Sequence, residues 1–422
     1  MGQTLAQKIL SRASSRDSVA VGDIVVAQPD IVTTHDLQFA LFMDRVRELG
    51  LEKPWDPDRI IVAVDHLIPT ATQKQEANLK RIRDYVSELG IKRFHDVGRH
   101  GISHQVAVEE GYITPGAFVV SGDTHALTLG AVGSFATYVN YELPQVLALG
   151  EIWLQVPETI RIVLNGQLRP GIMSRDIAHR IIADIGPDLG DYKCIEFDGP
   201  ALAELDMDQR MTLCNVPVEI GCKAAIALPD DRTAEYLEQR GHSRQALSLE
   251  LPDPEAEYAT TLEYDLSEIE LFIAPPPFPH NSQPLEAHIG KGVQQAYIGS
   301  CAGGRIEDLR MAAQVMKGKR VHPNTRTIIV PSSQRLYQQA LREGLIDIFI
   351  DAGAAVLTSS CGPCYVAQAP LVDGETCICT GTRNEPGRKG SHDADIYLAN
   401  AAVVAASALK GHIADPFDFL TG

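Results

Sequence analysis

Short apolar segments of this chain are followed, more than once, by an aspartate and a histidine and then by a helical pattern. Residues 60–64 lead into Asp65 and His66, and residues 116–120 lead into Ser121-Gly-Asp123-Thr124-His125. Such runs are typical of buried strands, and open α/β folds build their sites just beyond the carboxyl ends of strands. Because the pattern occurs twice, with His104 between the copies, it predicts an α/β fold with an Asp/His-lined pocket. Taken singly, either pair could be an ordinary turn at a strand end.

The chain is long enough for more than one domain. Its 422 residues exceed the roughly 250–300 residues at which a single core stops growing, so we expect two or three domains. The proline-rich residues 274–284 interrupt regular structure and are interpreted as a linker. We therefore predict three domains, at residues 1–154, 155–277 and 278–422. We also expect residues 101–105 to form a turn and residues 394–409 to form a helix of small side chains.

The charge and hydropathy of the chain argue against nucleic acid and membrane as partners. The 37 basic and 55 acidic residues give a formal net charge of −18, whereas a phosphate-binding face requires a basic surface. The longest apolar runs, residues 60–64 and 401–408, fall far short of the ~20 residues that span a bilayer. A cytoplasmic location is the default expectation.

Three of the eight cysteines stand in turns where thiolates could reach a metal centre. Cys361 and Cys364 flank a Gly-Pro turn, and this spacing alone fits a redox pair, a zinc knuckle or an iron–sulfur ligand pair. Cys301 likewise follows an apolar strand pattern. A structural zinc ion or an electron-transfer cluster would want four protein ligands, so three ligands with one open position are typical of a centre that binds substrate. The other five cysteines are expected to be buried thiols.

Two arginines and one glutamate add candidate polar groups. Arg383 and Arg388 lie five residues apart in a glycine-bearing loop, where each guanidinium group could grip a carboxylate bidentately. Glu219 lies within an apolar run, so its carboxylate is expected to be either paired or functional. Each of the three could instead be an ordinary surface charge.

Five motifs, in order along nearly the whole chain, resemble the signatures of the aconitase superfamily. They are Ser121-Gly-Asp123-Thr124-His125, Cys214-Asn215-Val-Pro-Val-Glu219-Ile-Gly, Ile298-Gly-Ser-Cys301-Ala-Gly-Gly-Arg-Ile-Glu-Asp-Leu, Ser360-Cys361-Gly-Pro-Cys364 and Arg383-Asn-Glu-Pro-Gly-Arg388. The resemblance implies three α/β/α domains around a central cluster cleft. It also implies a hydro-lyase that removes water from, and returns it to, a 2-hydroxy di- or tricarboxylic acid. The likeness is strongest toward the branch that includes homoaconitases and dehydratases of substituted malates.

The resemblance also assigns roles to individual side chains. It implies that a [4Fe-4S] cluster, with one iron that no cysteine binds, is held by Cys301, Cys361 and Cys364, with Asn215 beside it. It implies that the catalytic groups handling the proton of the leaving hydroxide are Asp65, His66, His104, Asp123, His125 and Glu219. It implies that the substrate is bound by His35, Thr124, Arg383 and Arg388.

A partner protein is implied as well. The family's catalytic base is a serine on a swivelling C-terminal domain, and in two-subunit members that domain is a separate small protein. Because this sequence ends at Gly422, soon after the third predicted domain, the resemblance implies a heteromer that is inactive without its small subunit. The residues leave two other classes open, namely a cluster-bearing RNA-binding or sensor protein and a structural zinc protein.

The chain differs from the family's motifs at positions beside the cluster and the pocket. The differing residues are Ala302 and Gly303 after Cys301, Thr124 and Ala126 around His125, and Thr382, Glu385 and Pro386 around Arg383. These differences bear on the identity of the substrate more than on the chemistry.

Overall fold

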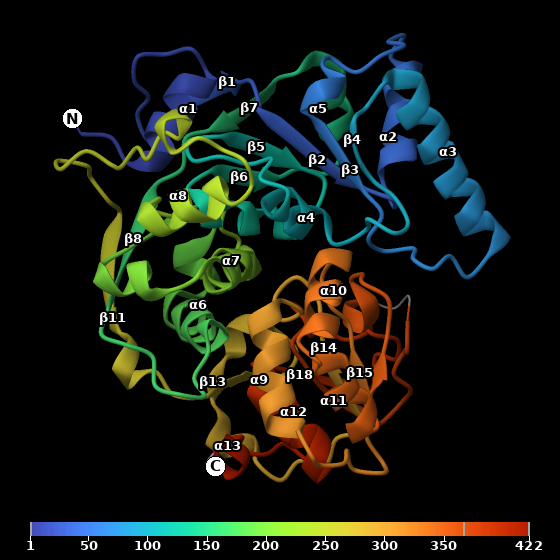
Figure 1. Ribbon diagram of the computed structural model, residues 1–422. Helices are drawn as coiled ribbons and strands as arrows, with labels where there is room; N and C mark the ends of the chain where they lie inside the picture. The colour runs from blue at the N-terminus through green and yellow to red at the C-terminus, as the bar shows by residue number, and fades with distance from the viewer. Residues whose placement is uncertain (1, 366–367, 421–422) are drawn as a thin grey trace. The chain divides into compact units, whose positions relative to one another are not determined.

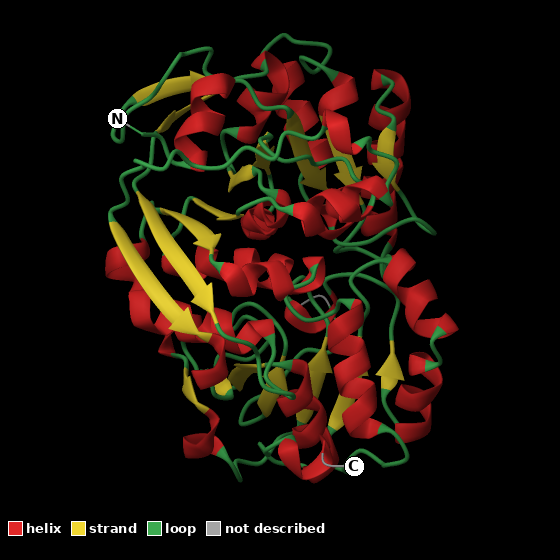
Figure 2. Ribbon diagram, turned by 60° about the vertical axis from the view of Figure 1, so that its left-hand side comes forward, coloured by secondary structure: helices red, strands yellow, loops and turns green. Residues whose placement is uncertain are grey.

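The computed structural model describes residues 2–365 and 368–420, which group into two compact units (Figure 1). Unit 1 comprises Met1–Gly98, Ser103–Gly166 and Asp188–Asp265, and unit 2 comprises Arg99–Ile102, Gln167–Pro187 and Leu266–Gly422. Figure 2 shows that both units combine strands with helices packed beside them. The predicted α/β class is confirmed. Within the described ranges, no helix is long and apolar enough to cross a membrane.

The first sheet of unit 1 has five strands in the order β4-β3-β2-β5-β6, and every neighbouring pair is parallel. Its strands are β2 (Ile31–His35), β3 (Ile60–Ala63), β4 (Arg93–His95), β5 (Phe118–Ser121) and β6 (Phe135–Tyr138). The segments around them are α1 (Leu5–Ala13), α2 (Phe39–Glu48), η1 (Pro57–Arg59), α3 (Gln73–Leu89), α4 (Ser103–Glu109), η2 (Thr124–Val132) and α5 (Leu143–Leu149). Strands β2, β3 and β5 are buried throughout, as near-continuous β-branched and apolar sequences in a parallel sheet predict.

The second sheet of unit 1 has four parallel strands in the order β10-β9-β8-β11. Its strands are β8 (Thr159–Asn165), β9 (Cys194–Asp198), β10 (Ala224–Ala227) and β11 (Thr260–Asp265). The accompanying segments are η3 (Pro200–Glu204), α7 (Met207–Asn215), η4 (Val216–Ile220), α8 (Asp231–Glu238) and η5 (Arg244–Ala246). A separate antiparallel ribbon pairs β1 (Ile24–Ala27) with β7 (Ile152–Gln155).

The two sheets of unit 1 are brought close by a glycine. A Cβ atom on Gly130, in η2, would collide with the carbonyl oxygen of Ala225 in β10. Only a residue without a side chain permits this approach of two backbones. The position of η2, which carries the predicted site residues Thr124 and His125, therefore depends on Gly130.

Unit 2 is built on one sheet of seven strands in the order β13-β12-β18-β17-β14-β15-β16. The parallel strands are β14 (Gln295–Ile298), β15 (Arg326–Ile329), β16 (Ala355–Val356), β17 (Thr376–Cys379) and β18 (Asp395–Ala399). The antiparallel edge consists of β12 (Phe272–Ala274) and β13 (Gln283–Pro284). The helices are α6 (Ser174–Gly190), α9 (Ile306–Met316), α10 (Gln334–Arg342), α11 (Leu345–Ala352), α12 (Ala401–Lys410) and α13 (Phe417–Leu420), with the 3-10 segments η6 (Leu266–Glu268), η7 (Pro279–Asn281), η8 (Leu285–His288) and η9 (Gly362–Cys364).

Three local expectations differ from the structure. The turn expected at residues 101–105 contains the start of helix α4, because the Asp65 carboxylate accepts a hydrogen bond from the first N–H of that helix. The helix expected at residues 394–409 is strand β18 followed by α12, and the Asn400 side chain caps the helix start. The proline-rich residues 274–284 connect the hairpin strands β12 and β13 inside unit 2, so they do not link the two units. The division into three domains stays a prediction.

Candidate active site

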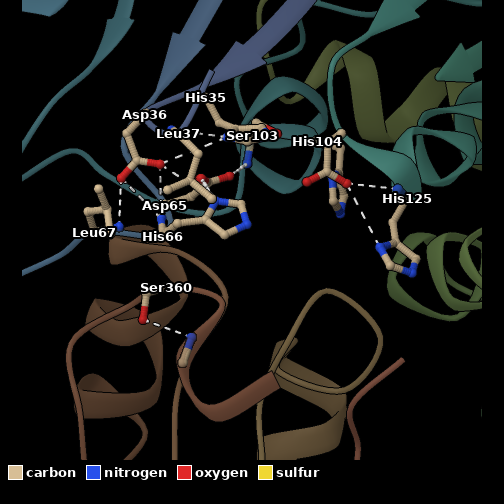
Figure 3. Close-up of polar contacts among 12 residues, drawn as sticks. His35, Asp36, Leu37, Asp65, His66, Leu67, Ser103, His104, His125 and Ser360 are labelled. Carbon is tan, nitrogen blue, oxygen red and sulfur yellow. Dashed lines mark hydrogen bonds and ion pairs between the residues drawn. The ribbon is translucent and has the colours of Figure 1, made fainter. Parts of the chain in front are cut away.

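Three groups of polar side chains lie at one edge of the five-stranded sheet, because three neighbouring parallel strands end there. β2 ends at His35, β3 is soon followed by Asp65 and His66, and β5 is followed by the Asp123–His125 segment. Carboxyl ends of adjacent parallel strands meet at the same edge. Figure 3 shows His35, Asp36, Asp65 and His66 gathered together, with His104 and His125 to one side.

The Asp65 carboxylate is completely buried and is held from two directions. Its Oδ1 lies 2.5 Å from Nδ1 of His66, and its Oδ2 accepts a hydrogen bond of 3.0 Å from the backbone N–H of Ser103. Burial raises the pKa of Asp65 above its usual range, even though the charge of His66 opposes the shift. The Asp65–His66 pair can therefore exchange a proton within one hydrogen bond.

Asp36 has the opposite environment. The backbone N–H groups of His66 and Leu67 donate to its two oxygens, at 3.2 Å and 2.6 Å. Burial alone would raise its pKa, but the hydrogen bond and charge of His66, followed by the charge of His35, bring the pKa of Asp36 to about 2. Asp36 is therefore an anion over the working pH range, and it holds the turn that presents His66.

His35 completes this group as a neutral ring. Its imidazole lies 4.5 Å from that of His66, measured between ring centroids, and its Nδ1 accepts a hydrogen bond of 3.3 Å from the backbone N–H of Leu37. Burial lowers the pKa of His35, and the neighbouring His66 lowers it further. A neutral imidazole with Nδ1 engaged leaves Nε2 as its remaining polar atom.

Asp123 precedes η2 and gathers two imidazoles. Its Oδ1 accepts a hydrogen bond of 2.7 Å from the backbone N–H of His125 and lies 3.6 Å from Nδ1 of His104. Burial alone would raise the pKa of Asp123, but the surrounding imidazoles, that of His104 first, hold it well below its usual range. The Asp123 carboxylate can therefore stabilise an imidazolium ion on His104 or on His125.

His125 has a second acidic partner from a distant part of unit 1. Its Nε2 lies 2.7 Å from Oε1 of Glu219, which belongs to η4. Glu219 was expected to be either paired or functional, and this contact shows that it is paired. Nearby, the Asn215 amide donates a 2.8 Å hydrogen bond to Oγ1 of Thr128, whose hydroxyl donates to the carbonyl of His125. Asn215 thus supports the segment that carries His125, and Thr124 beside it is half-buried.

The first group could also hold a single metal ion. One ligand atom from each of four residues lies within 4.8 Å of the others, and the residues are His35, Asp36, Asp65 and His66. Asp36 and Asp65 already accept hydrogen bonds from backbone N–H groups and sit beside imidazole nitrogen. The group is therefore complete as a hydrogen-bonded network, and proton transfer is the chemistry that its contacts favour.

In unit 2, the predicted cysteines also follow strand ends. β14 is followed by Cys301 and β16 by the segment that holds Cys361 and Cys364, and these strands belong to one run of parallel neighbours. Cys301 and Cys364 are buried, and Cys361 is half-buried. The Tyr297 hydroxyl donates a 2.8 Å hydrogen bond to the carbonyl of Cys361, and Arg388 donates from Nε to the carbonyl of Cys364 at 3.0 Å. The two ligand turns are thereby fixed through their backbones.

The loop after β17 is tied to the turn that carries Cys301. The Thr380 hydroxyl bridges the N–H and carbonyl of Gly299 at 2.8 Å each, and the Ser300 hydroxyl donates to the carbonyl of Thr380 at 2.9 Å. Arg175, from the start of α6, donates to the carbonyls of Thr380 and Gly381 at 2.8 Å and 2.5 Å. These hydrogen bonds therefore tie together two loops that are about 80 residues apart in sequence.

The predicted carboxylate-binding arginines lie in the next residues of the same loop. Arg383 and Arg388 are both half-buried. Nη1 of Arg388 lies 3.7 Å from Oε1 of Glu385, in addition to the hydrogen bond to Cys364. The Thr382 hydroxyl, at a position where the chain departs from the family motif, lies 3.5 Å from Sγ of Cys364. Glu385 and Thr382, which both depart from the family motif, therefore contact the predicted functional residues Arg388 and Cys364.

Sequence reasoning missed several residues that hold these groups in place. Ser103, Tyr297 and Arg175 were not singled out, and each of them reaches the site through a backbone group or a side chain from another element. Lys389, next to Arg388, was not singled out either, and its ammonium group contacts Cys377. A polar residue at the first position of a helix was the available signal for Ser103. For Tyr297, Arg175 and Lys389 the sequence offers no distinctive spacing.

The three cysteines are donors of the kind that an iron–sulfur cluster takes. Cys301, Cys361 and Cys364 follow strands that belong to one run of parallel neighbours. Iron–sulfur clusters are held by cysteine thiolates. The donor chemistry of these residues therefore fits such a cluster.

Comparison with known proteins agrees with this fold. The family model described as "Aconitase family (aconitate hydratase)" matches residues 7–411. The chain belongs to the aconitase family, it is a hydro-lyase, and membership of this family implies a [4Fe-4S] cluster.

Individual relatives are similar over their whole length. The 3-isopropylmalate dehydratase large subunit 1 of Methanopyrus kandleri is 40% identical over 422 residues, which is 100% of both chains. The 3-isopropylmalate dehydratase large subunit of Aquifex aeolicus is 41% identical over 99% of this chain and 97% of its own. The crystal structure of Thermococcus kodakaraensis aconitase X (holo-form) shares the fold, with a TM-score of 0.51 and 10% identity over 89% of this chain and 88% of that one.

Proposed function

We propose that this chain is the large subunit of a 3-isopropylmalate dehydratase, an enzyme of leucine biosynthesis. The supporting observation is that full-length relatives at about 40% identity are large subunits of this enzyme. The reaction removes water from a 2-hydroxy acid and returns it in the opposite orientation. Such a reaction needs a Lewis acid that binds the hydroxyl group, an acid that protonates the leaving hydroxide, and cations that bind the carboxylates.

The thiols of unit 2 would hold the cofactor. Cys301, Cys361 and Cys364 are the proposed ligands of a [4Fe-4S] cluster, with one iron left without a protein thiolate. That iron, when present, supplies Lewis acidity toward the substrate hydroxyl. The chain's own contribution is a set of backbone hydrogen bonds, from Tyr297 and Arg388, that orient the cysteine turns without engaging the sulfur atoms.

The Asp/His groups of unit 1 would handle protons. A leaving hydroxide must be protonated, and the Asp65–His66 pair holds a proton across a 2.5 Å contact. His104 and His125 can each carry a positive charge opposite the ionised Asp123, and Glu219 stabilises the same charge on His125. This arrangement allows a proton to be stored on an imidazole while the substrate is an unsaturated intermediate.

The remaining predicted residues would bind the substrate. Arg383 and Arg388 can each receive a carboxylate, and His35 and Thr124 offer neutral hydrogen-bonding groups. Glu385 already lies 3.7 Å from Arg388 and neutralises part of its charge. A third substrate carboxylate is therefore less favoured at this loop, which supports a dicarboxylate such as 3-isopropylmalate over the tricarboxylates of homoaconitase. Other substituted malates share this charge and differ only in the apolar substituent.

We further propose that the chain works with a small subunit that carries the swivelling domain and the serine base. The relatives are named large subunits, which supports a heteromeric enzyme. A cytoplasmic location follows from the metabolic role, and neither nucleic acid nor membrane is needed for it. The net charge of −18 is consistent with a small-molecule enzyme.

The decisive experiment is an anaerobic assay of the chain with a reconstituted cluster and a cognate small subunit. Hydration and dehydration of 3-isopropylmalate, homoaconitate and methylmalates should be compared by kcat/KM. We expect the highest value with 3-isopropylmalate and no turnover when the small subunit is omitted. Full activity of the chain alone would refute the proposed partner, and a preference for a tricarboxylate would refute the proposed substrate.

A further inference from the structure

A lysine directly after Arg388, in the loop that carries the arginines, is buried in unit 2. Only 2% of Lys389 is exposed, and its Nζ lies 3.0 Å from Sγ of Cys377 and 5.0 Å from the centroid of the Tyr297 ring. Lys389 forms no ion pair with a carboxylate in the part of the chain that the structure describes. A buried ammonium group is costly unless a negative charge lies nearby. A hydrogen bond from Cys377, opposed by burial and helped by the charge of Lys389, lowers the pKa of Cys379 to about 6, so a neighbouring thiolate supplies part of the compensation.

The surroundings of Lys389 lead to the predicted cluster ligands. Tyr297, whose ring faces the ammonium group, donates its hydroxyl hydrogen bond to the carbonyl of Cys361. Cys377 and Cys364 belong to the same buried cluster of side chains as Tyr297. Burial lowers the pKa of Lys389, but the thiol groups of Cys377, Cys379 and Cys364 outweigh it and raise the pKa. The ammonium group is thus held beside a thiol, Cys377, that belongs to the same buried cluster of side chains as the predicted ligand Cys364.

We propose that the buried ammonium group of Lys389 acts as a counter-ion to the iron–sulfur cluster and raises the reduction potential of the cluster. The inference rests on the proposed function, because it requires that Cys301, Cys361 and Cys364 hold a cluster. Three thiolates around a [4Fe-4S] core leave a net negative charge, and reduction adds one more. A fixed positive charge in a medium of low polarity stabilises the reduced form more than the oxidised form.

A second buried cation in unit 2 is Arg175, which feels the charge of Cys379, Cys364 and Cys301. Arg175 is 3% exposed and donates to the carbonyls of Thr380 and Gly381, and no carboxylate pairs with it among the described residues. Its backbone contacts give it a structural role of its own, so replacing it would disturb the loop. Lys389 is the better probe, since its ammonium group contacts a thiol and a ring and holds no backbone carbonyl among the described hydrogen bonds.

The test is the midpoint potential of the reconstituted cluster in the full chain, followed by EPR during an anaerobic redox titration. For Lys389→Met we expect the ratio of reduced to oxidised cluster at a fixed potential to fall at least threefold, which is about 28 mV for a one-electron couple. Lys291→Met is the matched control, because Lys291 also faces a tyrosine ring, at 5.1 Å, but is half-exposed and paired with Asp395. Its potential should equal that of the wild type.

Two further variants separate charge from packing. Lys389→Gln provides the same loss of charge if the methionine variant fails to fold, and it should lower the potential similarly. Cys377→Ala removes the hydrogen-bond partner but keeps the ammonium group. The ratio of reduced to oxidised cluster at the fixed potential should therefore stay within a factor of two of the wild-type ratio. Unchanged potentials in both lysine variants, or an equal shift in Cys377→Ala, would overturn the inference while leaving the proposed function intact. Failure of the wild-type chain to bind iron and sulfide would overturn both.

Discussion

Nε2 of His125 lies 2.7 Å from Oε1 of Glu219, although 94 residues separate them in the chain. Both side chains are less than a tenth exposed, so the carboxylate stabilises a positive charge on the imidazole with little screening by solvent. Glu219→Gln preserves the shape and removes that charge. We expect kcat to fall by about 10²–10⁴, the usual contribution of a group that assists proton transfer, with little change in melting temperature. Glu263→Gln, on an exposed face of β11, is the control and should leave kcat unchanged.

The thiols predicted to hold the cluster should be distinguishable from the other buried thiols. Cys361→Ser should abolish the visible absorption of the reconstituted protein and most of its bound iron and sulfide, because two remaining thiolates cannot hold the core. Cys222→Ser is the control, since burial raises the pKa of this thiol well above its usual value and keeps it protonated. Equal iron content in the two variants would contradict the assignment.

Arg388 should matter for binding more than for the chemical step. Arg388→Lys keeps the charge but loses the planar fork, and with it the hydrogen bond from Nε to the Cys364 carbonyl. We expect KM to rise ~10–100-fold, as for the loss of a charge-assisted hydrogen bond of about 1.5–3 kcal/mol. Arg310→Lys, at an exposed ion pair with Glu343, should leave KM within twofold. Steady-state kinetics of the two-subunit enzyme measures both.

Glu196 should make the stability of unit 1 depend on pH. Its carboxyl is fully buried, accepts hydrogen bonds from the Ala6 N–H and the Tyr258 hydroxyl, and has its pKa raised by burial from 4.5 to about 7. A raised pKa means that the folded chain binds the proton more tightly than the unfolded chain. The contribution of Glu196 to the free energy of unfolding is therefore complete below pH 4.5 and is lost as the pH rises through about 7.

Replacing Glu196 with glutamine should remove this dependence. We expect the decline in unfolding free energy between pH 4.5 and 7 to become smaller by about 2–4 kcal/mol in Glu196→Gln. Urea denaturation at a series of pH values measures the difference. An identical pH profile in wild type and variant would show that the Glu196 carboxyl is ionised in the folded chain.

Gly130 should be intolerant of any side chain. Gly130→Ala places a methyl group against the carbonyl oxygen of Ala225, so η2 or β10 must shift. We expect a loss of about 1–3 kcal/mol or more, the range for overpacked interiors, together with lower activity because η2 carries His125. Gly292→Ala is the control, since the nearest atom to its added Cβ lies 3.9 Å away and belongs to a flexible side chain. Denaturation midpoints compare the two.

Much of the site could be predicted because it follows strand ends. The apolar segments before Asp65, Asp123 and Cys301 predicted buried parallel strands, and parallel strands place their following residues at a common edge. The α/β class, the family and the hydro-lyase chemistry followed from these residues and their order. The predicted linker at residues 274–284 was wrong because a short hairpin connection and a linker share the same proline content.

What the sequence by itself determined is the set of reactive side chains and the strands that carry them, because hydrophobic pattern and local turn chemistry depend on near neighbours in the chain. Only the tertiary structure decided how those side chains are tuned. The N–H of Ser103 on Asp65, the carboxylate of Glu219 on His125 and the burial of Lys389 beside Cys377 all depend on which distant elements pack together. Desolvation and charge act through space, so the protonation state of each group follows from packing and not from sequence spacing.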